Sequence, residues 1–222
     1  MKKLISGIMT VAVALSLVAC QKETKVISLS GKTMGTTYHV KYLDDGSMSA
    51  TPEKAHEEIE AVLKDVNAKM STYKKDSELS LFNQSTQVNT PVEISRDFAT
   101  VLAEAIRLNK VTEGALDVTV GPVVNLWGFG PEKRVERQPT PEQLAERQAW
   151  VGIDKITLDM SGDKPMLSKV LPQVYIDLSS IAKGFGVDQV AEKLEQLKAQ
   201  SYMVEIGGEI RAKGKNIEGK SW

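Results

Sequence analysis

The sequence predicts an α+β fold, in which mixed or antiparallel sheets pack against helices. Three observations lead to this class. Segments that read as strands occur near both ends of the chain, and helices with recognisable caps lie between them. Two glycines at 207–208 separate a pair of short apolar segments, as in a β-hairpin. The strands and helices do not alternate regularly, which argues against a parallel α/β fold.

The N-terminal part of the predicted domain is a strand pair followed by a helix. Residues 26–29 and 36–43 read as strands joined across a turn at 31–35 that is bounded by glycines. Thr51 suits the cap of a helix, and Pro52 suits its first position. Apolar residues then recur at helical spacing as far as position 70, opposite a charged face.

Two further helices are predicted from their caps. Ser95 caps the first, which carries apolar residues on its inner side and ends before Gly114. Thr140 and Gln143 have the spacing of a capping box, so a second helix begins there.

The C-terminal part is predicted to combine strands with one more helix. Three segments predict a small antiparallel sheet: residues 153–160, 166–170 and 173–178. Residues 186–200 have one apolar side and read as a helix. Residues 202–206 and 209–213 form the hairpin across the two glycines.

Residues 1–19 have the pattern of a secretory signal. A basic start and an apolar stretch precede small residues and then Cys20, the arrangement of a bacterial lipobox in which the thiol is acylated. An ordinary signal peptide with a chance cysteine is the alternative. The apolar stretch is too short for a permanent span. We expect a signal peptide at 1–19, a tether at 20–25 and a domain at 26–222, lipid-anchored through Cys20 at the periplasmic face of a membrane. Whether this is the inner or the outer membrane stays open.

The composition of the chain excludes several kinds of site and partner. The 28 basic and 29 acidic residues give a net charge of −1, so no nucleic-acid partner is predicted. A single cysteine excludes an internal disulfide. The two isolated histidines, His39 and His56, offer neither a hydrolytic triad nor a zinc site. Any metal would be a hard cation on oxygen ligands, which indicates Mg²⁺.

Four motifs rich in glycine, hydroxyl residues or aspartate carry the functional signal. They are K-T-M-G-T at 32–36, S-T-Y at 71–73, G-A-L-D-V-T-V-G-P at 114–122 and D-L-S-S-I-A-K-G-F-G at 177–186. Such residues let the backbone approach a phosphate-bearing ligand. The fourth motif runs from a strand into a helix whose free amides favour an anion, beside the charge of Lys183. Asp177 there can accept hydrogen bonds from a ring edge or lie near a metal. The alternative is an ordinary turn with a capping Asp and a solvent-facing Lys.

The other motifs supply further candidate contacts. Asp117 is either a turn former or a binding group. Tyr73 offers a ring for stacking a flat heterocycle, or is an ordinary half-buried aromatic. Met34 can cover a ring with its adaptable side chain, or belongs to the core. The loop at 125–130 reads as packed and rigid, and 118–122 as extended.

With V-E-I-G-G-E at 204–209, these motifs resemble in order and spacing those of the ApbE family of FAD:protein FMN transferases. The resemblance implies a T-fold-related domain that cleaves FAD with Mg²⁺ and attaches FMN through a phosphoester to Thr or Ser of a target protein. It implies that Gly207 and Gly208 lie near the flavin and that the backbone at Ser180 contacts the metal. The FAD contacts that it implies are Met34, Tyr73, Ala115, Leu116, Asp117, Asp177 and Lys183.

The resemblance also implies partners and a further part of the protein. The acceptors would be exported subunits of a Na⁺-translocating NADH:quinone reductase or an Rnf complex. A C-terminal part with an Arg- and His-bearing loop and an Asp/Thr cluster would hold most of the Mg²⁺ ligands, so we expect the chain to be C-terminally incomplete, as a fragment or a truncated product. A non-catalytic flavin-binding lipoprotein, an inactive remnant and an FAD pyrophosphatase are the alternatives.

Overall fold

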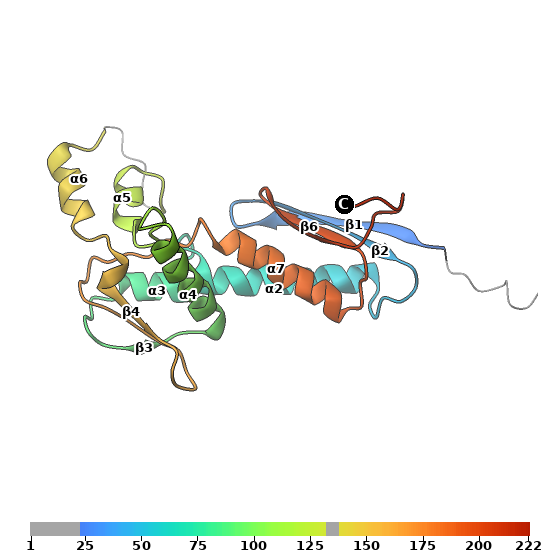
Figure 1. The fold of residues 1–222 in the computed structure, drawn as a ribbon, viewed down its shortest axis with the longest axis horizontal. Helices are drawn as coiled ribbons and strands as arrows, with labels where there is room; N and C mark the ends of the chain where they lie inside the picture. Colours follow the sequence, from blue (N-terminus) through green and yellow to red (C-terminus); the bar gives the residue numbers. More distant parts are fainter. Residues whose placement is uncertain (1–22, 132–137) are drawn as a thin grey trace, which may run out of the picture.

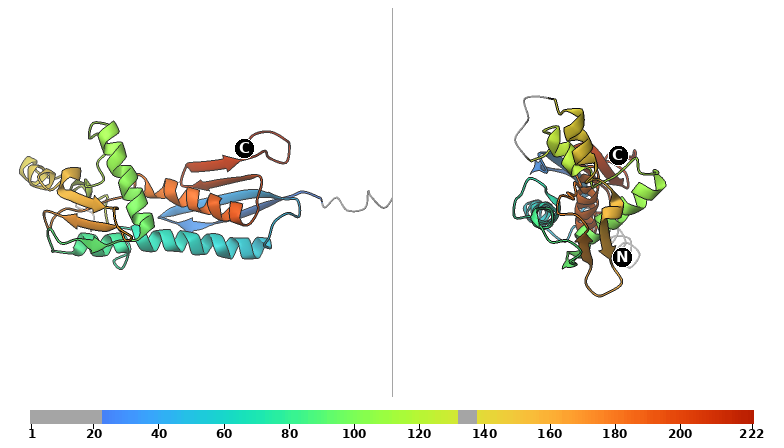
Figure 2. Two further views of the ribbon diagram at one scale, coloured as in Figure 1. Left: turned by 60° about the horizontal axis from the view of Figure 1, so that its bottom comes forward. Right: turned by 90° about the vertical axis from the view of Figure 1, so that its left-hand side faces the viewer.

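The computed structural model describes residues 23–131 and 138–222. Cys20, the predicted signal peptide and the first half of the predicted tether (20–22) lie outside these residues. The described chain has a sheet region and a helical region, and the long helix α2 (Pro52–Met70) extends from one into the other (Figures 1 and 2). This arrangement confirms the predicted α+β class.

The sheet region is a four-stranded antiparallel sheet in the order β1-β2-β6-β7. Its strands are β1 (Lys25–Thr33), β2 (Thr36–Asp44), β6 (Tyr202–Ile206) and β7 (Glu209–Lys213). Two-residue turns join β1 to β2 and β6 to β7, and both residues of each turn have positive φ. This is the backbone that tight hairpins require, and it explains the glycines at three of the four positions. Met34, with a φ of 49°, is the fourth.

Helices α2 and α7 (Ala182–Gln196) cover one face of this sheet (Figure 2). Alternate residues of β2, namely Tyr38, Val40 and Tyr42, point towards them and are buried. Thr51 caps α2 by accepting a hydrogen bond from the Lys54 amide, as its sequence predicts. Both helices continue into the helical region, so they bring the two hydrophobic cores together.

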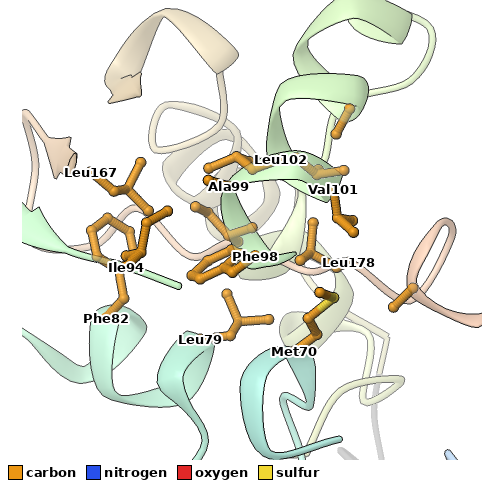
Figure 3. Close-up of a cluster of buried hydrophobic side chains, with 14 of the residues drawn as sticks. Met70, Leu79, Phe82, Ile94, Phe98, Ala99, Val101, Leu102, Leu167 and Leu178 are labelled. Carbon is orange, nitrogen blue, oxygen red and sulfur yellow. The ribbon is translucent and has the colours of Figure 1, made fainter. Parts of the chain in front are cut away.

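The helical region surrounds the core of which Phe98 is part (Figure 3). Its helices are α3 (Glu78–Gln84), α4 (Arg96–Val111), α5 (Gly121–Leu126) and α6 (Pro141–Gln148), with the short 3-10 helix η1 (Ile153–Lys155). A small antiparallel sheet in the order β3-β5-β4 completes it, with β3 (Val92–Glu93), β4 (Ile156–Asp159) and β5 (Met166–Lys169). The predicted caps at Ser95 and Thr140 are confirmed, including the capping box of α6.

Three predictions about this region and the start of α7 are wrong. Residues 173–178 form no strand, and β3 takes the place beside β5 that we assigned to them. Residues 118–122 are not one extended segment, because 118–120 make a single bridge, from Val120 to Tyr175, and 121–122 already belong to α5. Helix α7 starts at Ala182 rather than 186, because the carbonyl of Leu178 already accepts hydrogen bonds from the amides of residues 181 and 182. Helix α3 was not predicted. Among the described residues, no helix is long and apolar enough to cross a membrane.

Candidate functional site

A cavity of about 560 Å³ lies where the two regions meet. Its wall comes from four places in the chain: the β1–β2 turn, the last turns of α2, the segment that follows α2 and the start of α7. The lining residues include Met34, Val66, Asn67, Met70, Tyr73, Lys74, Ser179 and Lys183. Three of the four motifs that the sequence singled out therefore meet in one place.

Met34 enters the cavity from the tip of the β1–β2 hairpin. Its side chain lies against Gly186 of α7, where an added β-carbon would come within 2.8 Å of the methionine Cε. The glycine thus makes room for Met34 to pack between the hairpin and the helix. A flexible thioether held in this way can cover one face of a flat ligand.

Tyr73 stands at the mouth of the cavity with 66 % of its surface exposed. Its hydroxyl donates to the carbonyl of Phe129 at 3.1 Å, and Ser71 Oγ accepts from the Tyr73 amide at 3.2 Å. The ring is held at both ends, while much of it stays open to a ligand. Phe129 is itself 72 % exposed and residues 125–126 belong to α5, so our interpretation of 125–130 as a packed loop is wrong at these residues.

Lys183 lies in the first turn of α7 and supplies the positive charge of the cavity wall together with Lys74. Its Nζ forms an ion pair with Glu209 Oε1 at 2.7 Å. Glu209 Oε2 is buried and has no hydrogen-bond partner within the described residues. The turn at Gly207 lies beside them, since a β-carbon there would be 3.5 Å from Lys183 Cδ. We did not identify Glu209 from the sequence, although it ends the V-E-I-G-G-E motif.

Asp177 lies next to the cavity. Its Oδ1 accepts from the amide of Ser179, a lining residue, at 2.8 Å. Its own amide donates to the carbonyl of Val118 at 2.7 Å, which joins the fourth motif to the third. Ser180, the predicted metal contact, is exposed.

Asp117 and its neighbours are placed differently. The Asp117 carboxylate accepts from the Thr119 amide and hydroxyl at 2.8 and 2.6 Å, and from the Ile153 amide at 3.2 Å. It therefore orders its own turn, the first of the two roles considered above. Ala115 is exposed and Leu116 packs against the core of the helical region. None of the three lines the cavity, and their contacts with FAD stay predictions.

A metal site is not built by these residues alone. Across the parts of the chain that the structure describes, no group of three or more His, Cys, Asp or Glu side chains is close enough to hold an ion. His39 pairs with Glu205 at 2.8 Å, and His56 Nε2 lies 2.8 Å from the Tyr38 hydroxyl. The described residues therefore do not fit a complete Mg²⁺ site, and the role of Ser180 stays a prediction.

Comparison with known proteins decides the family. Residues 34–222 match the model of the ApbE family. The chain belongs to the ApbE family. It is 88 % identical to a FAD:protein FMN transferase of Haemophilus influenzae over 222 residues, which are 100 % of this chain and 64 % of that protein. A FAD:protein FMN transferase of Vibrio cholerae is 51 % identical over 97 % of the chain and 63 % of its own length.

Solved structures of ApbE proteins have the same fold. The flavin transferase ApbE of Vibrio cholerae superposes with a TM-score of 0.84 at 52 % identity, over 90 % of this chain and 63 % of that one. The flavinyl transferase ApbE of Pseudomonas stutzeri, in its apo form, gives a TM-score of 0.82 at 35 % identity, over 91 % and 65 %. These findings confirm the resemblance inferred from the motifs. The chain spans slightly less than two thirds of the length of these ApbE relatives.

Proposed function

We propose that the chain is the FAD-binding part of a FAD:protein FMN transferase. The observation that carries the proposal is that Met34, Tyr73 and Lys183 line one and the same cavity. The relatives of the chain in the ApbE family are named for this activity. Each wall of the cavity suits one part of FAD. Met34, Val66 and Met70 offer an apolar surface to the isoalloxazine ring, and Tyr73 offers a ring for stacking. The start of α7, with Lys183, suits the pyrophosphate.

The residues of this chain bind and orient FAD in the proposed reaction. An acceptor Thr or Ser hydroxyl attacks the phosphorus on the FMN side, and the bond from that phosphorus to the bridging oxygen breaks. AMP leaves with the bridging oxygen, and the proton of the hydroxyl passes to solvent. The positive charge of Lys183 stabilises the negative charge that grows on the phosphates.

Several finer points rest on the family resemblance and belong to the same proposal. The reaction uses Mg²⁺, with most ligands outside the described residues. The acceptors are subunits of a Na⁺-translocating NADH:quinone reductase or an Rnf complex. The protein is anchored through an acylated Cys20 at the periplasmic face of the membrane, in the compartment of these exported acceptors.

The test is the intact mass of a purified acceptor domain after incubation with the chain, FAD and Mg²⁺. The full-length Haemophilus influenzae relative is the positive control, and EDTA replaces Mg²⁺ in a parallel sample. A metal-dependent gain of one FMN supports the proposal. Free FMN and AMP without the adduct would indicate an FAD pyrophosphatase instead. FAD that stays bound and intact would indicate a non-catalytic flavin-binding protein.

Lys183→Met is expected to weaken FAD binding by about 10- to 100-fold, because a hydrogen bond from a charged group contributes roughly 1.5–3 kcal/mol. Quenching of FAD fluorescence measures the dissociation constant. Lys193→Met is the matched control, since Lys193 lies on the same helix but pairs with Glu58 at 3.1 Å and does not line the cavity. Equal losses in the two variants would argue against a contact between Lys183 and FAD.

A further inference from the structure

Lys169, at the end of β5, is a buried cation surrounded by backbone carbonyls. Its side chain belongs to a residue with only 2 % of its surface exposed. The ammonium donates to the carbonyls of Asn83 at 3.2 Å, Pro172 at 3.0 Å and Val174 at 3.3 Å. It also lies 5.2 Å from the centre of the Phe82 ring. Within the described parts of the chain, no carboxylate is close enough to pair with it.

Asn83, on α3, holds the same stretch of chain as Lys169, since Ile176 lies two residues after Val174. Its Nδ2 donates to the carbonyl of Ile176 at 2.8 Å, and its Oδ1 accepts from the amide of Ile176 at 2.8 Å. One side chain thus makes the pair of hydrogen bonds that a neighbouring strand would otherwise make. All of these bonds are buried or partly buried.

The segment that these two side chains hold leads directly into the candidate site. The amide of Asp177, which follows Ile176, donates to the carbonyl of Val118. Ser179, two residues later, lines the cavity. The third and fourth motifs therefore take their positions from a stretch of chain outside both sheets, which these two side chains fix together with the backbone bridge from Val120 to Tyr175.

The energetic cost of burying Lys169 indicates that this side chain is needed to fix the path of residues 172–178. Burial of an ammonium without an opposite charge is costly, and an apolar side chain would avoid that cost. An apolar side chain would, however, leave two buried carbonyls and a partly buried one without their donor. A lysine is favoured at this position if the path of residues 172–178 has to be fixed.

We propose that Lys169 and Asn83 are positioning residues for FAD, which clamp residues 172–178 so that Ser179 is correctly placed in the cavity wall and Asp177 beside it. This inference rests on the proposed function. Neither side chain lines the cavity of the candidate site, so both act through the segment that they hold.

The test compares Lys169→Met and Asn83→Ala with Leu102→Ala, a control in the same hydrophobic core whose side chain makes no hydrogen bond to the segment. Either clamp variant is expected to raise the dissociation constant of FAD by about tenfold or more, whereas the control changes it less than about twofold. Hydrogen exchange of the amides of Ile176 and Asp177 is expected to accelerate only in the clamp variants. At saturating FAD, the visible circular dichroism of the bound flavin should change in Asn83→Ala and not in the control.

The outcomes separate the clamp from the proposed function. Wild-type chain that binds no FAD would overturn the proposed function and the positioning role together. The clamp alone would be overturned if the wild-type chain binds FAD and Asn83→Ala does not differ from it. The two proteins would then have the same dissociation constant, the same amide exchange rates and the same spectrum of the bound flavin. Asn83→Ala decides the question even if Lys169→Met does not fold, because it leaves the buried cation and all three of its backbone carbonyl acceptors, including that of residue 83, in place.

Discussion

Replacement of Phe98 by alanine is expected to lower the free energy of unfolding by about 3–5 kcal/mol. The ring has no exposed surface and lies among the side chains of the core that α3, α4 and the small sheet share (Figure 3). Its removal loses the burial of a large apolar surface and leaves a cavity that rigid neighbours fill only in part. Urea denaturation of the purified chain, followed by circular dichroism, measures the loss.

Two variants control for this prediction. Leu81→Ala removes an apolar side chain of α3 that is mostly exposed, and it should change the stability by no more than about 0.5 kcal/mol. Phe98→Leu keeps much of the volume and should cost clearly less than the alanine variant. A loss for Phe98→Ala as small as that for Leu81→Ala would mean that this core is loosely packed.

The helices were predictable because their signals are local. Thr51, Ser95 and Thr140 each cap the helix that follows within a few residues, and all three side chains accept the expected hydrogen bond. The β1–β2 turn consists of Met34 and Gly35 alone and is shorter than the predicted 31–35, because residues 31–33 stay paired in β1. The β6–β7 turn is the predicted Gly207–Gly208, with the positive φ that a tight hairpin needs at both residues. Local sequence determines such features almost completely, so tertiary packing does not overrule them.

Residues 173–178 were not predictable for the opposite reason. Their buried alternation is that of a strand, but the partner of Ile176 is the side chain of Asn83, 93 positions earlier in the chain. No pattern within the segment indicates such a partner. The short β3 pairs with β5 instead, and only two of its residues are paired, which is too few for a pattern to show.

The sequence predicted individual residues of the candidate site, but not the contacts between them. The motifs identified Met34, Tyr73 and Lys183, which the fold gathers into one cavity. They did not indicate that Glu209 pairs with Lys183, because the two residues lie on different elements and meet only when β7 folds beside α7. They also left both roles open for Asp117, and only the hydrogen bonds of its carboxylate reveal the turn.

Lys169 also gives the second large effect, a dependence of stability on pH. Burial lowers the pKa of Lys169 from 10.5 to about 8. Between these two values the unfolded chain binds the proton and the folded chain does not, so the free energy of unfolding rises with pH in this window. Below pH 8 both states are protonated and the cost of the buried charge is fully present. Above pH 10.5 both states are neutral and the cost is gone.

The size of the effect follows from the difference in pKa. At about 1.4 kcal/mol for each unit, wild type should gain up to about 3 kcal/mol between pH 8 and 10.5 relative to Lys169→Met. The three carbonyls favour the ammonium and oppose this gain, so about 3 kcal/mol is its upper limit. The variant serves as the reference because every other titrating group cancels, including Tyr42 and Tyr202, whose pKa values burial raises to about 12.

Urea denaturation of both proteins at several pH values from 7 to 10.5 measures this difference. A stability difference that stays constant over the whole range would mean that the pKa of Lys169 does not change on folding, and that its three carbonyl acceptors balance the cost of burial. A difference that moves in favour of the methionine variant as pH rises would contradict the sign itself. It would require the pKa of Lys169 to be raised on folding, as for a lysine that gains a carboxylate partner.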